Sequence, residues 1–320
     1  MPQGLMMHTH YTLSHLLIFL VGIIVCLFVD LKAHSEDKPV STGSALRWSV
    51  FWIGLAQCFA FYIFLVHGAD DASLFLAGYW LEKSLSVDNL FVMMAIFASF
   101  SIRDEYLHRV LFYGIAGALV LRLVFIVLGS SFLAFFGPYA LAIFGIFVLW
   151  SAYKMWQQMH APQTEIEDYS KHWAVTLTRK FFPVHDRLSG HDFFVRSGEN
   201  GAYLATPLFL CLVVIEFADI MFAFDSVPAV IAITQDPFLV YTSNVFAILG
   251  MRSLFFLLAA AKRYLVHLEK AVIVILIYIG LKMLLDMTGW LHLSPLVSLA
   301  VVAVLLIGGI AASLLYPEKE

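Results

Sequence analysis

Long apolar runs separated by short polar connections make up most of the chain. A helix that crosses the hydrocarbon core of a bilayer needs about 20 predominantly apolar residues. Nine stretches meet this requirement, at residues 12–30, 48–67, 74–100, 110–129, 138–157, 204–232, 238–260, 270–287 and 294–316. The pattern therefore predicts an all-α, polytopic membrane protein with about nine transmembrane helices.

The composition agrees with this prediction. Apolar residues make up 61% of the 320 residues and charged residues only 13%, whereas soluble domains contain about 25% charged residues. The sequence contains no H-E-x-x-H, G-x-S-x-G or Walker motif, so we expect neither enzyme activity nor a prosthetic group. Basic patches interleaved with aromatic residues are also absent from the sequence, which argues against a nucleic-acid partner.

The basic residues predict an orientation. Fifteen of the 19 Lys and Arg residues lie in alternate connections or at the span ends that border them, none lies in the intervening connections, and the remaining four lie deeper within predicted spans. Basic connections face the cytoplasm. We therefore expect the N-terminus outside and the C-terminus in the cytoplasm, in a bacterial inner membrane.

Five carboxylates lie well inside the third and sixth predicted spans. Glu82 and Asp88 are in the third span, and Glu216, Asp219 and Asp225 are in the sixth. A charge at the bilayer centre costs at least about 2.5–3.5 kcal/mol, and leucine would stabilise the helix better. The acids therefore indicate a place where a cation is held within the membrane.

Neutral oxygen donors accompany these acids, namely Asn89, Ser226 and Asn244. Oxygen ligands favour Mg, Ca or Mn over softer metals. Pro228 lies inside the sixth span, where it predicts a broken helix that exposes carbonyl oxygens to a cation.

Four basic residues share the spans with the acids: Lys83, Arg122, Arg252 and Lys282. A guanidinium or ammonium group repels a cation, so we expect them to be counterions or gating groups. In the alternative interpretation they only neutralise the acids in structural pairs. The protein would then be a membrane-assembly or interaction protein whose 158–203 loop recruits partners.

Two blocks of three spans show the same order of charges. The first contains Glu82, Asp88, Arg122 and Lys154, and the second contains Asp219, Asp225, Arg252 and Lys282. Each block has an odd number of spans, so the two insert in opposite orientations, as the inverted repeats of many secondary transporters do.

The repeats divide the chain into five segments. They are a two-helix addition (1–73), repeat 1 (74–157), a cytoplasmic loop with a short hairpin (158–203), repeat 2 (204–287), and a final transmembrane helix with a cytoplasmic tail (288–320).

The acidic stretches resemble the signature segments of a known family. Glu82–Val92 (EKSLSVDNLFV) and Glu216–Ala229 (EFADIMFAFDSVPA) resemble those of the TerC family, and residues 205–207, 236–238 and 243–252 add further matches. This tellurium-resistance-C-like group of integral membrane proteins includes Alx-type members and is part of the wider LysE-type transporter group. The resemblance implies export of manganese or another divalent cation, with the five acids as ion-handling residues.

We therefore expect a secondary transporter that exports a divalent cation, with Mn²⁺ as the favoured cargo, by alternating access. The expected ligands are Asp88, Asp225, Asp219, Glu216, Glu82, Asn89, Ser226 and Asn244. The expected partners are the lipid bilayer and the transported cation. The sequence leaves open H⁺ or Na⁺ as coupling ion and whether the protein forms a homo-oligomer. A further alternative is a tellurite-resistance factor that acts indirectly, since an acidic lining disfavours an oxyanion cargo.

Overall fold

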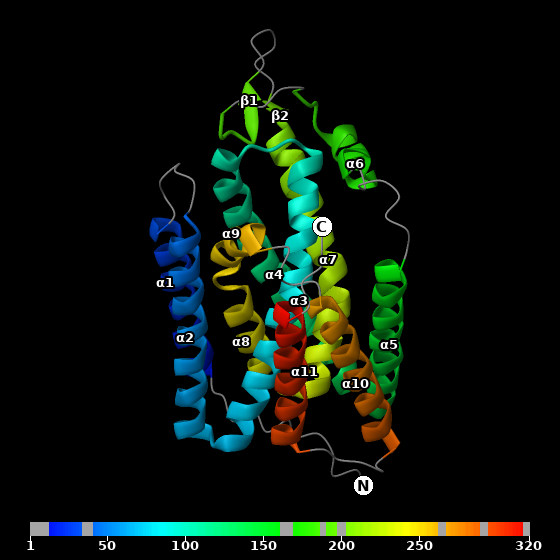
Figure 1. The fold of residues 1–320 in the computed structure, drawn as a ribbon. Coiled ribbons are helices and arrows are strands. Elements are labelled where there is room, and N and C mark those ends of the chain that lie inside the picture. The colour runs from blue at the N-terminus through cyan, green and yellow to red at the C-terminus, as the bar shows by residue number, and fades with distance from the viewer. Residues whose placement is uncertain are drawn as a thin grey trace.

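The computed structural model describes residues 13–33, 41–160, 169–185, 190–196, 203–261, 267–288 and 294–315. These residues form eleven α-helices, a short 3₁₀ helix and one two-stranded sheet (Figure 1). The helices are α1 (Leu13–Ala33), α2 (Thr42–His67), α3 (Ala69–Ser99), α4 (Asp104–Phe136), α5 (Pro138–His160), α6 (Trp173–Phe181), α7 (Pro207–Ile233), α8 (Pro237–Ile248), α9 (Met251–Ala261), α10 (Leu268–Thr288) and α11 (Pro295–Leu315). The 3₁₀ helix η1 is Tyr169–Lys171, and the strands are β1 (Phe194–Arg196) and β2 (Tyr203–Ala205).

The all-α membrane class is confirmed. Within the described residues, five helices are long and apolar enough to cross a bilayer: α2, α4, α5, α7 and α11. The bent pair α8 and α9 makes a sixth if it counts as one span. The helices α1, α3 and α10 fall outside this set, and α3 and α10 include charged side chains along their lengths. Nine spans therefore stay a prediction.

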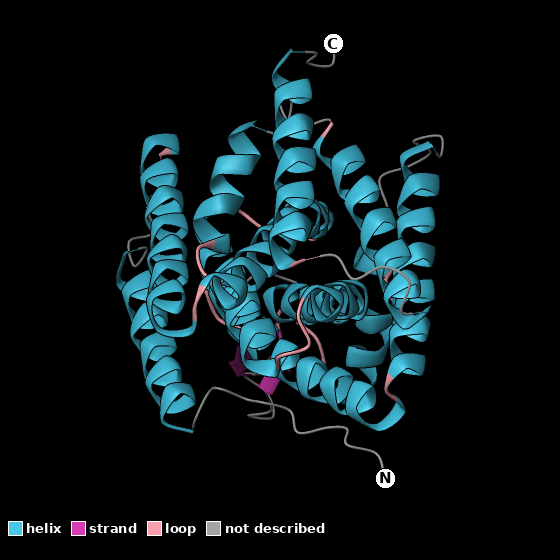
Figure 2. Cartoon of the chain, turned by 90° about the horizontal axis from the view of Figure 1, so that it is seen from below, coloured by secondary structure: helices cyan, strands magenta, loops and turns pink. Residues whose placement is uncertain are grey.

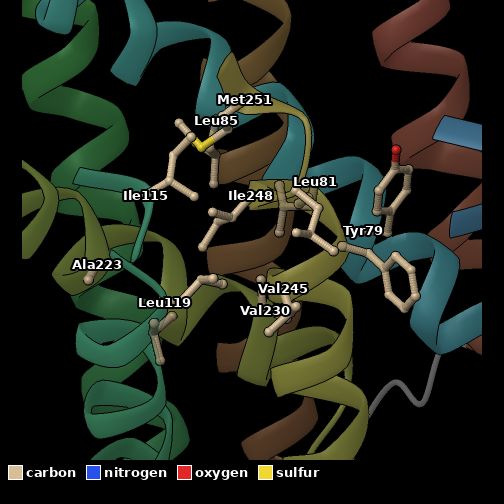
Figure 3. Close-up of a cluster of buried hydrophobic side chains, with 14 of the residues drawn as sticks. Tyr79, Leu81, Leu85, Ile115, Leu119, Ala223, Val230, Val245, Ile248 and Met251 are labelled. Carbon is tan, nitrogen blue, oxygen red and sulfur yellow. The ribbon is translucent and has the colours of Figure 1, made fainter. Parts of the chain in front are cut away.

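Helices from the two halves of the chain pack against each other. α4 packs against α7, α3 against α8, and α5 against α10, while α3 also contacts α7. Viewed from below, helices at the centre of the molecule are seen nearly end-on, with inclined helices around them (Figure 2). The buried apolar cluster in Figure 3 draws on α3 (Leu81), α4 (Ile115), α7 (Val230), α8 (Val245) and α9 (Met251).

The helix break lies in a different span from the one that the sequence predicted. α7 runs unbroken from Pro207 to Ile233 with Pro228 inside it, so the expected break at this proline is wrong. Proline removes one donor, and a membrane helix tolerates this where surrounding groups satisfy the freed carbonyl. The next span breaks instead, because Gly250 has φ +80° and α8 meets α9 at 46°.

The predicted hairpin in the long connection is confirmed in its two strands. β1 and β2 pair antiparallel, with Val195 opposite Leu204. α6 lies earlier in the same connection and packs against α7. The boundaries of the five predicted segments stay a prediction.

Gly250 provides a test of the break. A Cβ at this position would lie within 2.7 Å of three side-chain atoms of Trp52, and the positive φ adds strain. We expect Gly250→Ala to lower the stability by roughly 1–3 kcal/mol, measured as thermal unfolding in detergent. Gly308→Ala is the matched control, because nothing lies within 4 Å of a Cβ there. Equal melting temperatures for the two variants would contradict the packing described for the break.

Candidate functional site

The centre of the candidate site is the guanidinium of Arg122 on α4. Its Nη1 atom lies 2.5 Å from Oε1 of Glu82 on α3 and donates hydrogen bonds to Oγ of Ser226 (2.6 Å, α7) and Oδ1 of Asn244 (2.8 Å, α8). The Arg122 and Glu82 side chains are only 2% and 0% exposed. The oxygen atoms of three predicted ligands thus surround one cationic nitrogen. These ligands come from three helices and from both predicted repeats.

Local hydrogen bonds orient polar side chains in and beside the cluster. Nδ2 of Asn244 donates to the Val240 carbonyl at 2.9 Å, one turn earlier in α8, which fixes Oδ1 toward Arg122. In α3, Oγ of Ser86 donates to the backbone carbonyl of Glu82 at 2.8 Å. These local bonds occupy the amide nitrogen of Asn244 and the hydroxyl hydrogen of Ser86, so Oδ1 of Asn244 is free to accept from Arg122.

Several polar atoms of this cluster have no hydrogen-bond partner. They are both carboxylate oxygens of Glu82, Nε of Arg122 and Oδ2 of Asp219. Oε1 of Glu82 nevertheless lies 2.5 Å from Nη1 of Arg122 in the ion pair. Buried polar atoms in native proteins are nearly always hydrogen-bonded, and exceptions concentrate where an ion or water binds. The cluster is therefore incomplete as a hydrogen-bonded network.

The acids at this place outnumber the base. Asp219 is buried and close enough to Arg122 for electrostatic attraction, and it interacts with both Glu82 and Glu216. With the three carboxylates ionised, the single charge of Arg122 leaves two negative charges unbalanced. Such an arrangement is suited to a positively charged guest.

Gly117 permits the close approach of Glu216 to α4. Glu216 is half-buried on α7, and a Cβ at Gly117 would overlap its carboxylate group. Glycine at this position lets the carboxylate lie directly against the α4 backbone. The sequence reasoning did not assign Gly117 a role, although it lies only five residues before Arg122.

The structure leaves some predicted ligands untested. Asp88 and Asp225 lie on α3 and α7, but their side chains are outside the described part of the structure. Asn89 is buried on α3, and the described contacts include none between it and Arg122. Within the described residues, no three His, Cys, Asp or Glu side chains are arranged to hold a metal ion together.

Arg252 has a partner that is not among the five predicted acids. On α9 it pairs instead with Asp30 of α1, and it also donates to the Asp30 backbone carbonyl at 2.8 Å. Its guanidinium lies 5.7 Å from the ring centre of Phe112. The sequence reasoning missed Asp30, although it is the only acid in the first apolar stretch.

The two lysines also lie away from the carboxylate cluster. Nζ of Lys83 donates to the carbonyls of Ala247 (3.0 Å) and Leu249 (3.4 Å), which end α8 at the helix break. A cation at a helix C-terminus complements the helix dipole. Lys282 interacts with Asp286, one turn later in α10. Among the four predicted counterions, the described contacts place only Arg122 with the central acids.

Comparisons with known proteins agree with the resemblance. The family model described as integral membrane protein TerC family matches residues 67–320. The chain is 45% identical to "Tellurium resistance protein TerC" of Serratia marcescens, over 98% of this chain and 96% of that protein. It is 40% identical to "Putative membrane-bound redox modulator Alx" of Escherichia coli strain K12, over 89% of each. It is also 40% identical to "Thylakoid membrane protein TERC, chloroplastic" of Arabidopsis thaliana, over 89% of this chain and 71% of that protein. No solved structure matches the chain.

The ion pair between Arg122 and Glu82 predicts strong coupling. Arg122→Met leaves the buried Glu82 without its opposite charge, which typically costs about 3–5 kcal/mol. We expect the double variant Glu82→Gln/Arg122→Met to regain much of this loss in thermal unfolding experiments. Arg103→Met is the control, because the Arg103–Glu105 pair is exposed and 3.7 Å long, so its loss should change little. Additive losses in the double variant would show that the two side chains are not coupled.

Proposed function

Because the chain belongs to the TerC family of integral membrane proteins, we propose that it is a secondary transporter that exports a divalent metal cation, with Mn²⁺ as the favoured cargo. The observation that supports this most directly is the excess of buried carboxylates over base around Arg122, together with Oδ2 of Asp219, which has no hydrogen-bond partner among the described residues. On this proposal the protein is not an enzyme, and the cation is its cargo.

The donor types fit a hard divalent cation. Carboxylate, hydroxyl and amide oxygens come together at Glu82, Ser226 and Asn244, with Asp219 nearby. Oxygen sites of this kind suit Mg, Ca or Mn. We include Asp88 and Asp225 in the proposed site because they lie in the same two signature segments as the acids of the cluster.

The helix packing supports alternating access by two inverted repeats. In the proposed repeats α3 corresponds to α7, α4 to the α8–α9 pair, and α5 to α10. The packing of α4 on α7 then has its counterpart in the packing of α8 on α3. A pseudo-two-fold axis would produce these paired contacts. We propose that the two repeats rock around the central cluster, with the N-terminus outside and the C-terminus in the cytoplasm of a bacterial inner membrane.

Arg122 gives this mechanism an internal cation. Its guanidinium already occupies the oxygens that a transported cation would use. A metal ion that enters must displace Arg122 from Glu82 or share the carboxylates with it. We propose that Arg122 pairs with Glu82 again when the cargo has left. This pairing balances one of the buried negative charges and so lowers the cost of returning the empty site through the membrane.

The names of the relatives also mention tellurium resistance. A tellurite oxyanion would meet two unbalanced carboxylates at this cluster, so we propose that any contribution of this chain to such resistance is indirect. A purely structural role is supported for two pairs outside the central cluster. Arg252 pairs with Asp30, and Lys282 interacts with Asp286.

Transport in proteoliposomes tests the proposal. We expect uptake of Mn²⁺ into vesicles, measured with an internal metal-sensitive dye, across a panel with Mg²⁺, Ca²⁺ and Zn²⁺ and with imposed H⁺ or Na⁺ gradients. Glu82→Gln and Asp219→Asn should reduce the rate by at least tenfold, because each removes a cluster charge.

Asp70→Asn is the matched control. Asp70 is an exposed acid in the first turn of the same helix α3, so this variant should transport like the wild type. Wild-type rates for both cluster variants, or no metal flux in any protein, would refute the transporter proposal.

A further inference from the structure

The helix α6 exposes an apolar stripe outside the predicted spans. Trp173, Leu177 and Phe181 are 57%, 38% and 74% exposed. They are spaced four residues apart, so they follow one another along the same side of the helix. A helix in a water-exposed loop would normally bury such a stripe, so the question is which surface covers it.

The remaining sides of α6 are accounted for. Ala174, Val175 and Thr178 are buried on the side that faces the protein, where the helix packs against α7. Arg179 and Lys180 are exposed. With about 3.6 residues per turn, the apolar stripe lies between the protein-facing side and the charged side. A helix at the junction of protein, lipid and water has this arrangement.

The position of α6 along α7 matches the edge of a bilayer. The ring of Trp173 lies 4.8 Å from the ring of Phe217, which is ten residues, or roughly 15 Å, from the start of α7. The 27 residues of α7 span roughly 40 Å, which exceeds the hydrocarbon thickness of about 30 Å. α6 therefore lies near one end of the part of α7 that we expect to cross the membrane. Figure 1 shows α6 in the upper part of the molecule, on the same side as the hairpin.

We infer that α6 is an interfacial helix that inserts its Trp173–Leu177–Phe181 stripe into the membrane and binds anionic phospholipid headgroups through Arg179 and Lys180. Amphipathic helices with aromatic and leucine residues on one side and basic residues on the other bind membranes in this way. A second copy of the chain is a poorer partner, because two such helices would bring like charges together.

This assignment gives the long connection between the predicted repeats a membrane anchor. α6 is followed in the chain by the hairpin and then by α7, which supplies Ser226 and Asp219 to the central cluster. The inference is independent of the proposed cargo, because it rests only on the exposed stripe, its charges and its contact with α7.

A fluorescent reporter at single cysteines tests the insertion. The full-length protein, with Cys26, Cys58 and Cys211 replaced by alanine, would be labelled with an environment-sensitive dye at position 177, 181 or 176 and reconstituted into vesicles. We expect lipid-borne quenchers to quench the dye at 177 and 181, and aqueous iodide to quench it at 176, because Thr176 is exposed on the charged side. Preferential iodide quenching at 177 and 181 would overturn the inference.

The lipid preference is tested in vesicles of phosphatidylcholine with and without phosphatidylglycerol. We expect phosphatidylglycerol to increase lipid quenching at 181, and Arg179→Gln and Lys180→Gln each to weaken this effect by on the order of fivefold. Lys154→Gln is the control, because Lys154 lies on α5, where its Nζ is over the ring of Trp150. This variant should leave the effect of phosphatidylglycerol on quenching at 181 unchanged. A dye at 181 could instead be shielded from iodide by a second copy of the chain. Shielding that persists in detergent and disappears when the protein is diluted would indicate such pairing and overturn the inference. Gel filtration and thermal unfolding would verify that each variant is folded.

Discussion

The requirement that buried charges be balanced determines the organisation of the central helices. Removing an ion from water costs several kcal/mol, which only an opposite charge or well-placed polar groups recover. Arg122 meets this requirement with Glu82, Ser226 and Asn244, and it thereby links α4 to α3, α7 and α8. Because these partners come from both halves of the chain, the electrostatic centre is also the place where the halves pack together.

The two halves are alike in sequence order but differ in how they use their charges. Arg122 of the first block contacts the central acids, whereas Arg252 of the second is occupied by Asp30. Lys83 holds the carbonyls at the end of α8, and Lys282 interacts within its own helix. A symmetric pattern in the sequence thus produces an asymmetric site with one internal cation. In the transport cycle that we propose, this asymmetry would assign to Arg122 the pairing with Glu82 in the empty site.

The sequence predicts much of this arrangement because hydrophobic length and buried charge are local signals. The all-α membrane class and the hairpin strands follow from it. Glu82, Ser226 and Asn244, which the sequence groups together as candidate ligands, all contact Arg122. Long-range partners do not follow from the sequence, because the reach of a side chain across helices depends on packing that spacing does not encode. This is why Asp30 was missed as the partner of Arg252. The prediction from Pro228 was wrong for a related reason. A proline removes one hydrogen-bond donor from the helix, but the surrounding groups decide whether the helix breaks there. The break lies at Gly250 instead.

The pair of Arg252 and Asp30 has an evolutionary consequence. The region matched by the family model begins at residue 67, so Asp30 lies before it and Arg252 lies inside it. Arg252, within the region that the family model matches, therefore depends for its charge balance on α1, which lies before that region. Homologues that lack an acid at the position of Asp30 should carry a neutral residue in place of Arg252 or a substitute acid nearby, so the two positions should change together across an alignment.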